Sequence, residues 1–267
     1  MRGEWAVRRV VLAGSAPAVD VAFQGKAAHV FHSRQSSEGP FQGGSAPVAL
    51  PGRDGFLVTV PPREGELTLV DFATKAVTRL GAEGDAVVVS ARGDAVIVEP
   101  PGYGAAMSLV SLNDKSRVGL RGCHNEAAWG AAAFAADGSL WATLFNGTQF
   151  TMSAQRFDAT GKPQCGVAVH VDRISALAAS AHALFVLDIA GSLQAYDAST
   201  GAHVASLEFG EQWMAARFDD GGAIELTGNA SEAAAALWCK ANDAAVWSPC
   251  PTSAMSTPRR LLPLLAP

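Results

Sequence analysis

Short apolar segments alternate with polar turns along most of this chain. A recurring unit consists of an apolar strand, one polar residue, a short turn and a second apolar strand. Its copies span 67–80, 108–120, 155–167 and 194–207. The aligned polar residues Asp71, Asn113, Asp158 and Asp197 are 42, 45 and 39 positions apart. A period of about 40 residues built only from short strands predicts a β-propeller, in which each repeat forms one four-stranded blade.

Turn residues set the register of the strands within each predicted blade. The innermost strand ends at a Gly/Asp turn, as at 52–55, 92–94, 137–138 and 219–222. Glycine tolerates positive φ and aspartate bonds its own backbone, so both reverse the chain between paired strands. Several first and second strands are apolar on both faces, which is typical of strands buried between neighbouring blades.

The spacing of the innermost strands predicts six blades. Candidates lie near Val21, Val48, Val87, Trp129, Ala176 and Ala215. The first blade is expected to be degenerate, because 34–47 replaces most of its outer strands. The N-terminal EWAVRRVVLA is expected to close the ring as an outer strand of the last blade, which would cover exposed sheet edges. We expect one all-β propeller domain over 1–250, since a closed ring of repeats has no internal boundary.

The C-terminal segment 251–267 has a different composition. It contains four prolines and no strand pattern. Such a segment is predicted to be a linker, a docking peptide or a disordered tail.

Two turn motifs resemble those of the WD-repeat and quinoprotein-like superfamily of β-propellers. One is Asp137-Gly138-Ser139-Leu140-Trp141, and the other contains Tyr196-Asp197 and Thr200-Gly201. The resemblance covers about residues 45–250. It implies the propeller fold and a strand-swapped closure. The subfamily stays open, because no repeat carries the terminal Trp-Asp pair or the Gly-His pair of strict WD repeats.

A second resemblance, to six-bladed lactonases of the senescence marker protein and gluconolactonase family, suggests a different function. Ser37-Glu38-Gly39-Pro40 and the strand that begins at Gly55 are similar to that family's opening blade, and Asp188 lies in ALFVLDIAG. The resemblance implies that Glu38 binds a Ca²⁺ or Zn²⁺ ion and that Asp188 is a ligand and catalytic base. Such an ion would polarise a lactone carbonyl. At the positions that match the family's two asparagine ligands this chain has Gly130 and Arg173 instead. The positive charge of an arginine repels a bound cation.

Composition narrows the classes of partner. The formal net charge is −5 and only 17% of residues are charged, so no basic field is available for nucleic acid. No apolar stretch approaches the roughly 18–20 residues that span a bilayer. The N-terminal apolar run is shorter than that of a secretion signal. We expect a bacterial cytoplasmic protein that binds neither nucleic acid nor membrane.

Four cysteines, Cys123, Cys165, Cys239 and Cys250, show no CxxC spacing. In the predicted register Cys123 and Cys165 lie on or after outer strands of different blades, which argues against a bond between them. Cys239 and Cys250 both belong to the last blade and are close enough in sequence to meet. Since cytoplasmic proteins keep thiols reduced, we expect reduced structural cysteines.

The predicted loops between second and third strands are longer and more varied than the other turns. They span 36–47, 60–67, 99–107, 145–150 and 227–233, and the propeller register assigns them to one face. Loops on a rigid scaffold commonly carry recognition. Aromatic and arginine side chains, from which interface hot spots are built, occur there as Phe41, Arg63, Tyr103 and Phe150.

The leading hypothesis is therefore a non-catalytic protein-interaction module or scaffold subunit without a cofactor, which binds a protein partner through these loops. The alternative is the metal-dependent lactone hydrolase. A third interpretation is a structural subunit whose segment 251–267 docks onto a larger complex.

Overall fold

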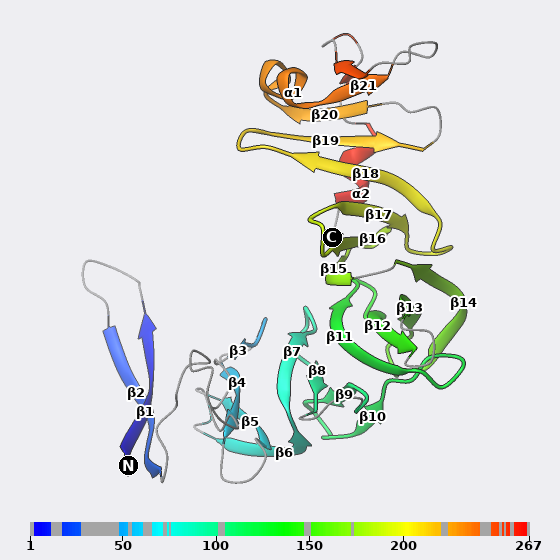
Figure 1. Cartoon of the computed structure of the whole chain (residues 1–267). Helices are drawn as coiled ribbons and strands as arrows, with labels where there is room; N and C mark the ends of the chain where they lie inside the picture. Colours follow the sequence, from blue (N-terminus) through cyan, green and yellow to red (C-terminus); the bar gives the residue numbers. More distant parts are fainter. Residues whose placement is uncertain are drawn as a thin grey trace. The chain divides into compact units, whose positions relative to one another are not determined.

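The computed structural model describes part of the chain. The described residues are 3–11, 18–27, 48–52, 55–60, 66–71, 74, 76–100, 105–146, 151–171, 174–219, 224–240, 247–250, 253, 255–256 and 259–265. The chain divides into two compact units, residues 1–119 and 120–267. Figure 1 shows the strands of both units. No described helix is long and apolar enough to cross a membrane.

The described residues of the first unit form three antiparallel sheets. Strand β1 (Gly3–Val11) pairs with β2 (Ala18–Ala27) in a two-stranded sheet. A four-stranded sheet follows, with β3 (Val48–Ala49), β4 (Gly55–Val60), β5 (Glu66–Asp71) and β6 (Val77–Glu83). The next has β7 (Asp85–Val89), β8 (Ala95–Glu99), β9 (Ser108–Ser111) and β10 (Arg117–Gly119). In both four-stranded sheets the strands follow chain order, as in a propeller blade.

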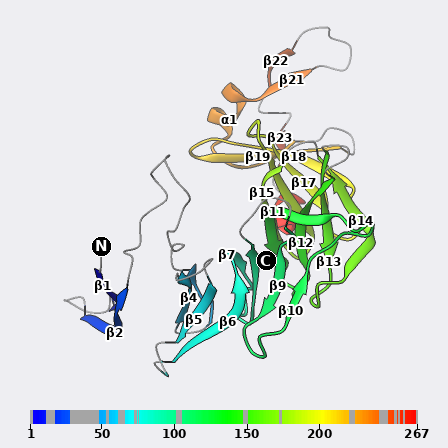
Figure 2. The ribbon, with the colours of Figure 1, turned by 60° about the horizontal axis from the view of Figure 1, so that its bottom comes forward.

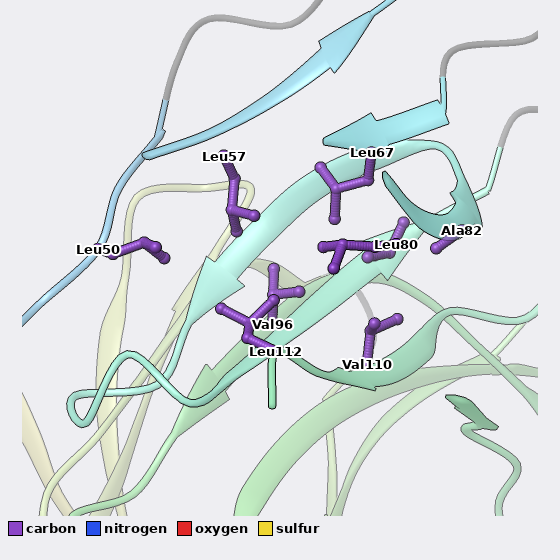
Figure 3. Close-up of a cluster of buried hydrophobic side chains, with 9 residues drawn as sticks. Leu50, Leu57, Leu67, Leu80, Ala82, Val96, Val110 and Leu112 are labelled. Atoms are coloured by element: carbon purple, nitrogen blue, oxygen red, sulfur yellow. The ribbon is translucent and has the colours of Figure 1, made fainter. Parts of the chain in front are cut away.

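The two four-stranded sheets of the first unit share an apolar core. Leu57 on β4, Leu67 on β5 and Leu80 on β6 belong to one buried cluster with Val96 on β8 and Val110 on β9. Figure 3 shows these side chains pointing toward one another. Removing such leucine and valine side chains from water is the main force that holds the sheets together.

The second unit begins with one four-stranded sheet and continues with a longer one. The first consists of β11 (Ala127–Phe134), β12 (Leu140–Asn146), β13 (Thr151–Phe157) and β14 (Pro163–His170). The second has seven strands: β15 (Ile174–Ala179), β16 (Ala183–Asp188), β17 (Leu193–Asp197), β18 (His203–Phe209), β19 (Trp213–Phe218), β20 (Ile224–Gly228) and β23 (Met255–Ser256). Trp141 and Ala154 pack with Leu184 and Val186 between the two sheets.

Two short helices and a hairpin complete the second unit. They are α1 (Ala230–Ala236), the pair β21 (Trp238–Lys240) and β22 (Trp247–Pro249), and α2 (Leu261–Leu265). The Asn229 side chain accepts the Ser231 and Glu232 amides and so caps α1. Helix α2 packs through Leu261 against Ala195 and Phe218 of the seven-stranded sheet. Figure 2 shows α1 next to the hairpin of β21 and β22.

The repeated turns predicted from the sequence are present. At three of the four aligned positions the polar side chain itself closes the turn. The Oδ1 atom of Asp71 accepts the Thr74 amide at 2.8 Å. In the same way Asp158 accepts the Thr160 and Lys162 amides, and Asp197 accepts the Ser199 and Thr200 amides. At the remaining copy Asp114 takes this role, because its Oδ1 atom accepts the Ser116 amide at 3.0 Å. The repeat in the sequence is therefore a repeat of side-chain-closed turns.

The strand pairing corrects the predicted start of the sixth blade. That blade was expected to begin near Ala215, but β19 pairs directly with β18 and thus extends the preceding sheet. The connection 210–212 is a short hairpin closed by a bond from the Gly210 amide to the Trp213 carbonyl. A glycine-containing loop of this length joins antiparallel neighbours.

The N-terminal closure, with EWAVRRVVLA on the last blade, stays a prediction. Within the first unit β1 pairs with β2 from Gly3 opposite Ala27 to Val11 opposite Ala18, with a register shift between Val7 and Arg8. Among the described strands no sheet closes on itself. The structure therefore shows propeller-like antiparallel sheets in succession, whereas the number of six blades stays a prediction.

The C-terminal segment binds the chain's own sheet. Strand β23 pairs in parallel with β20, which covers the last edge of that sheet. The Glu225 side chain on β20 is only 5% exposed and accepts the Arg260 and Leu261 amides at 2.6 and 2.9 Å. We call the described residues 255–256 and 259–265 the C-terminal clasp.

The expectation of reduced cysteines is wrong. Cys123 and Cys165 form a disulfide, Cys250 is also disulfide-bonded, and none of the described cysteines is free. Cys123 lies in the segment between β10 and β11, and the bond joins this segment to Cys165 on β14. The sequence register had assigned the two residues to different blades. A bond between Cys250 and Cys239 stays an expectation.

Candidate functional site

The predicted loop residues lie outside the described part of the chain. This holds for Phe41, Arg63, Tyr103 and Phe150, and for the predicted metal ligand Glu38. Asp188 is described, at the end of β16. Its Oδ1 atom accepts the Ala190 and Ser192 amides at 2.8 Å each, so its carboxylate closes the β16–β17 turn. Within the described ranges, no group of three or more His, Cys, Asp or Glu residues is arranged to hold a metal ion.

A set of polar side chains gathers on one face of the seven-stranded sheet. We call it the polar strip. It consists of Gln194, Tyr196, His203, Ser206, Arg217 and Asp219, on or next to β17, β18 and β19. Gln194 lies opposite Ser206, which lies opposite Arg217, while Tyr196 lies opposite His203. Directly opposed residues share a face, so these strands bring the polar groups together.

A β-bulge places His203 in the strip. Ala195 pairs with Ala205, and the next residue, Tyr196, pairs with His203. Val204 is therefore an extra residue in β18. In a regular strand two residues three positions apart point to opposite faces. The bulge reverses this alternation, so His203 faces the same side as Ser206.

Hydrogen bonds fix the side chains of the strip relative to one another. His203 Nδ1 lies 2.6 Å from Asp219 Oδ2, and His203 Nε2 lies 2.7 Å from Gln194 Oε1. The Ser206 hydroxyl donates to the same Gln194 oxygen at 2.7 Å. The Gln194 amide nitrogen in turn donates to the Ser192 hydroxyl at 2.8 Å. The Gln194 side-chain amide thus holds Ser192, His203 and Ser206 in place. A recognition surface needs side chains that are positioned in this way before a partner binds.

The strip lies between two packed regions of its own face. On the β16 side Tyr196 packs against the cluster that contains Trp141 and Leu184. On the β20 side Trp213 and Leu226 are buried with α1. The strip itself is partly exposed: the side chains of His203, Arg217 and Asp219 are 31%, 32% and 57% accessible.

The surroundings of Tyr196 disfavour its ionised form. Burial raises the pKa of Tyr196, and the carboxylates of Asp188 and Asp219 raise it further because they disfavour a phenolate. Arg217 lies 3.9 Å from Glu208, a long ion pair at a partly exposed position. The Tyr196 and His203 rings meet edge to face, with centroids 5.2 Å apart. The surface therefore combines an aromatic edge, an arginine and negative charge.

The geometry suits binding better than nucleophilic catalysis. In a nucleophile–base pair the hydroxyl donates directly to the imidazole. Here the Ser206 hydroxyl donates to Gln194, and the same Gln194 oxygen lies against His203 Nε2. The groups therefore hold one another in position, and Ser206 is not activated by His203.

Sequence reasoning missed the strip, although part of the signal was present. On β17, Gln194 and Tyr196 are two positions apart with the apolar Ala195 between them. At the end of β19, Arg217 and Asp219 are likewise separated by one apolar residue. Period-two polar positions on two strands indicate one polar face. The hairpin that pairs β18 with β19 and the bulge at Val204 are needed to bring those positions together, and neither is visible as a pattern.

Comparison with known proteins gives little further information. No family model matches the chain, and no curated protein matches it. Among solved structures, a chain in the crystal structure of a nidogen/laminin complex is similar, with a TM-score of 0.43 and 7% identity. The similarity covers 68% of this chain and 74% of that chain. A similarity this weak carries no conclusion about fold or function.

Proposed function

We propose that this protein is a non-catalytic protein-interaction module or scaffold subunit built on a propeller-like fold, and that the polar strip is part of its binding surface. The observation that carries the proposal is the hydrogen-bonded order of Gln194, His203, Ser206 and Asp219 on a partly exposed sheet face. Prepositioned side chains lose little conformational entropy when a partner binds. Tyrosine and arginine are also the residue types enriched at binding hot spots.

The loop residues Phe41, Arg63, Tyr103 and Phe150 remain a second part of this proposal. They are aromatic and arginine side chains, and proline pairs stiffen two of their loops, 60–67 and 99–107. The protein partner, the six-bladed ring and the cytoplasmic location stay predictions. Because disulfides persist mainly in oxidising compartments, fractionation of source cells tests the predicted location directly.

Partner capture with matched variants tests the strip. The bait is the full chain, and the partners that it retains from a lysate of the source cells are quantified by mass spectrometry. His203→Ala with Arg217→Ala should reduce capture about tenfold or more, since hot-spot truncations commonly have this effect. The control is His182→Ala with Arg92→Ala, which removes the same residue types at exposed positions outside the strip.

The possible outcomes separate the two surfaces. Unchanged capture by a correctly folded strip variant would refute the role of the strip. Replacing Phe41, Arg63 and Tyr103 together with alanine tests the loops in the same assay. If neither set of substitutions changes capture, the interaction role assigned to these surfaces is wrong.

A further inference from the structure

The Cys123–Cys165 disulfide joins two sulfur atoms in unequal surroundings. Cys123 is partly buried in the segment between β10 and β11, whereas Cys165 on β14 is exposed. Disulfide exchange begins when a thiolate attacks one sulfur, and access decides which sulfur reacts. Exposure therefore favours attack at Cys165.

An irregularity of β14 explains why Cys165 is accessible. Gln155 on β13 pairs with Ala168, but Phe157, two residues later, pairs with Pro163. Residues 164–167 thus lie opposite the single residue 156 and depart from the regular ladder of paired residues. At Gly166, a Cβ atom would meet no other atom within 4 Å, so the space beside Cys165 is open.

A buried amide holds the other half of the disulfide. The Gln155 side chain is almost fully buried, in a residue only 4% exposed. Its Oε1 atom accepts the Cys123 backbone amide at 3.2 Å, and its Nε2 atom donates to Cys123 Sγ at 3.0 Å. The same Nε2 atom also donates to the Gln164 carbonyl at 3.4 Å, so one side chain bridges both cysteine segments. An N–H donor aimed at a sulfur stabilises that sulfur as a thiolate.

We propose that this disulfide is a thiol–disulfide exchange site for small thiols such as glutathione, with Cys165 as the attacked sulfur and Cys123 as the leaving group. The incoming thiolate forms a new S–S bond with Cys165 Sγ. The Cys123–Cys165 bond breaks, and its electron pair passes to Cys123 Sγ, which becomes a thiolate that accepts a hydrogen bond from Gln155. In the reverse step the Cys123 thiolate attacks Cys165 Sγ, restores the native bond and releases the small thiolate. The exchange involves no net oxidation, and it is independent of the proposed interaction role.

Trapping the mixed disulfide tests this polarity. The full-length oxidised protein is treated with reduced glutathione, the reaction is quenched with N-ethylmaleimide, and the modified peptides are mapped by mass spectrometry. Glutathione should be found on Cys165 and maleimide on Cys123, in at least about tenfold excess over the reverse pattern, because Cys165 is the accessible sulfur and Cys123 is the sulfur that is hydrogen-bonded as a leaving group. Equal labelling, or glutathione mainly on Cys123, would overturn the assignment.

Two further measurements distinguish exchange in the native state from a purely structural disulfide. Gln155→Leu should lower the Cys165-to-Cys123 labelling ratio about tenfold, because it removes the donor to the leaving sulfur. Loss of stability would also lower this ratio by exposing both sulfurs, so the labelling is done under conditions in which urea unfolding shows that Gln155→Leu is fully folded. Gln212→Leu, at an exposed position, is the control. If glutathione reacts only at urea concentrations that unfold the protein, or if the ratio is unchanged in Gln155→Leu, the proposal fails.

Discussion

Removing the Cys123–Cys165 disulfide should destabilise the second unit strongly. The bond links residues 42 positions apart, and it therefore limits the freedom of a long segment in the unfolded chain. In the chain-entropy model a loop of this length corresponds to about 4 kcal/mol of stability at 25 °C. For a domain of this size, that free energy lowers the melting temperature by about 8–16 °C. The test is the variant Cys123→Ser with Cys165→Ser, measured by calorimetry and urea unfolding.

The same experiment contains its own control. Cys250 stays disulfide-bonded in this variant, so any further loss on adding a reductant reports that second bond. The wild-type protein in reductant should lose at least as much stability as the serine variant does without it. A decrease in melting temperature of less than about 2 °C would refute the argument, because the unfolded chain would then gain no freedom from loss of the bond.

Three other predictions concern the second unit. Burial opposes ionisation of Glu225, but hydrogen bonds from Leu261 and Arg260 outweigh it and hold its pKa below the ordinary glutamate value of about 4.5. The stability that this carboxylate contributes is therefore complete above about pH 4.5 and is lost as the pH falls through the lowered pKa. Glu225→Gln should remove this pH dependence, and amide exchange in 259–265 measures it. Arg156 donates to the Ala198 carbonyl at 2.9 Å, so Arg156→Ala should cost about 1–3 kcal/mol in urea unfolding, with little rescue by lysine. Gly228→Ala should cost about 2–5 kcal/mol of stability, because φ is +96° and the added Cβ atom would clash with the Gln212 carbonyl oxygen. Gly191→Ala should cost only about 1–2 kcal/mol, because φ is similar at +85° but the added Cβ atom meets open space. Equal losses in the two glycine variants would contradict the steric argument.

The fold was predictable from the sequence where the information is local. Asp71, Asp158 and Asp197 close their own turns with side-chain oxygens, and this chemistry depends on residues only two to four positions away. The same pattern does not specify which strand pairs with the next. A three-residue connection after Phe209 allows a hairpin, so β19 extends the preceding sheet rather than opening a new one.

The site was less predictable, because it depends on irregularities in the strands. Strict alternation predicts that His203 and Ser206 face opposite sides, and only the extra residue Val204 brings them together. Cys165 likewise lies in an irregular part of β14, and its bond to Cys123 is one that the predicted blade register argued against. Patterns in a sequence report regular strands well, whereas bulges arise from tertiary contacts between strands.

The position of the C-terminal clasp has a consequence for synthesis of the protein. A ribosome makes β15 to β20 before it makes the C-terminal clasp, although the clasp covers the edge of β20 and the sheet face that contains Phe218. Until they emerge, the growing chain presents an unpaired strand edge beside an apolar surface, the combination that promotes association between nascent chains. The sheet is therefore most vulnerable in the short interval before its last segment is translated, and a chaperone that acts then would protect it most.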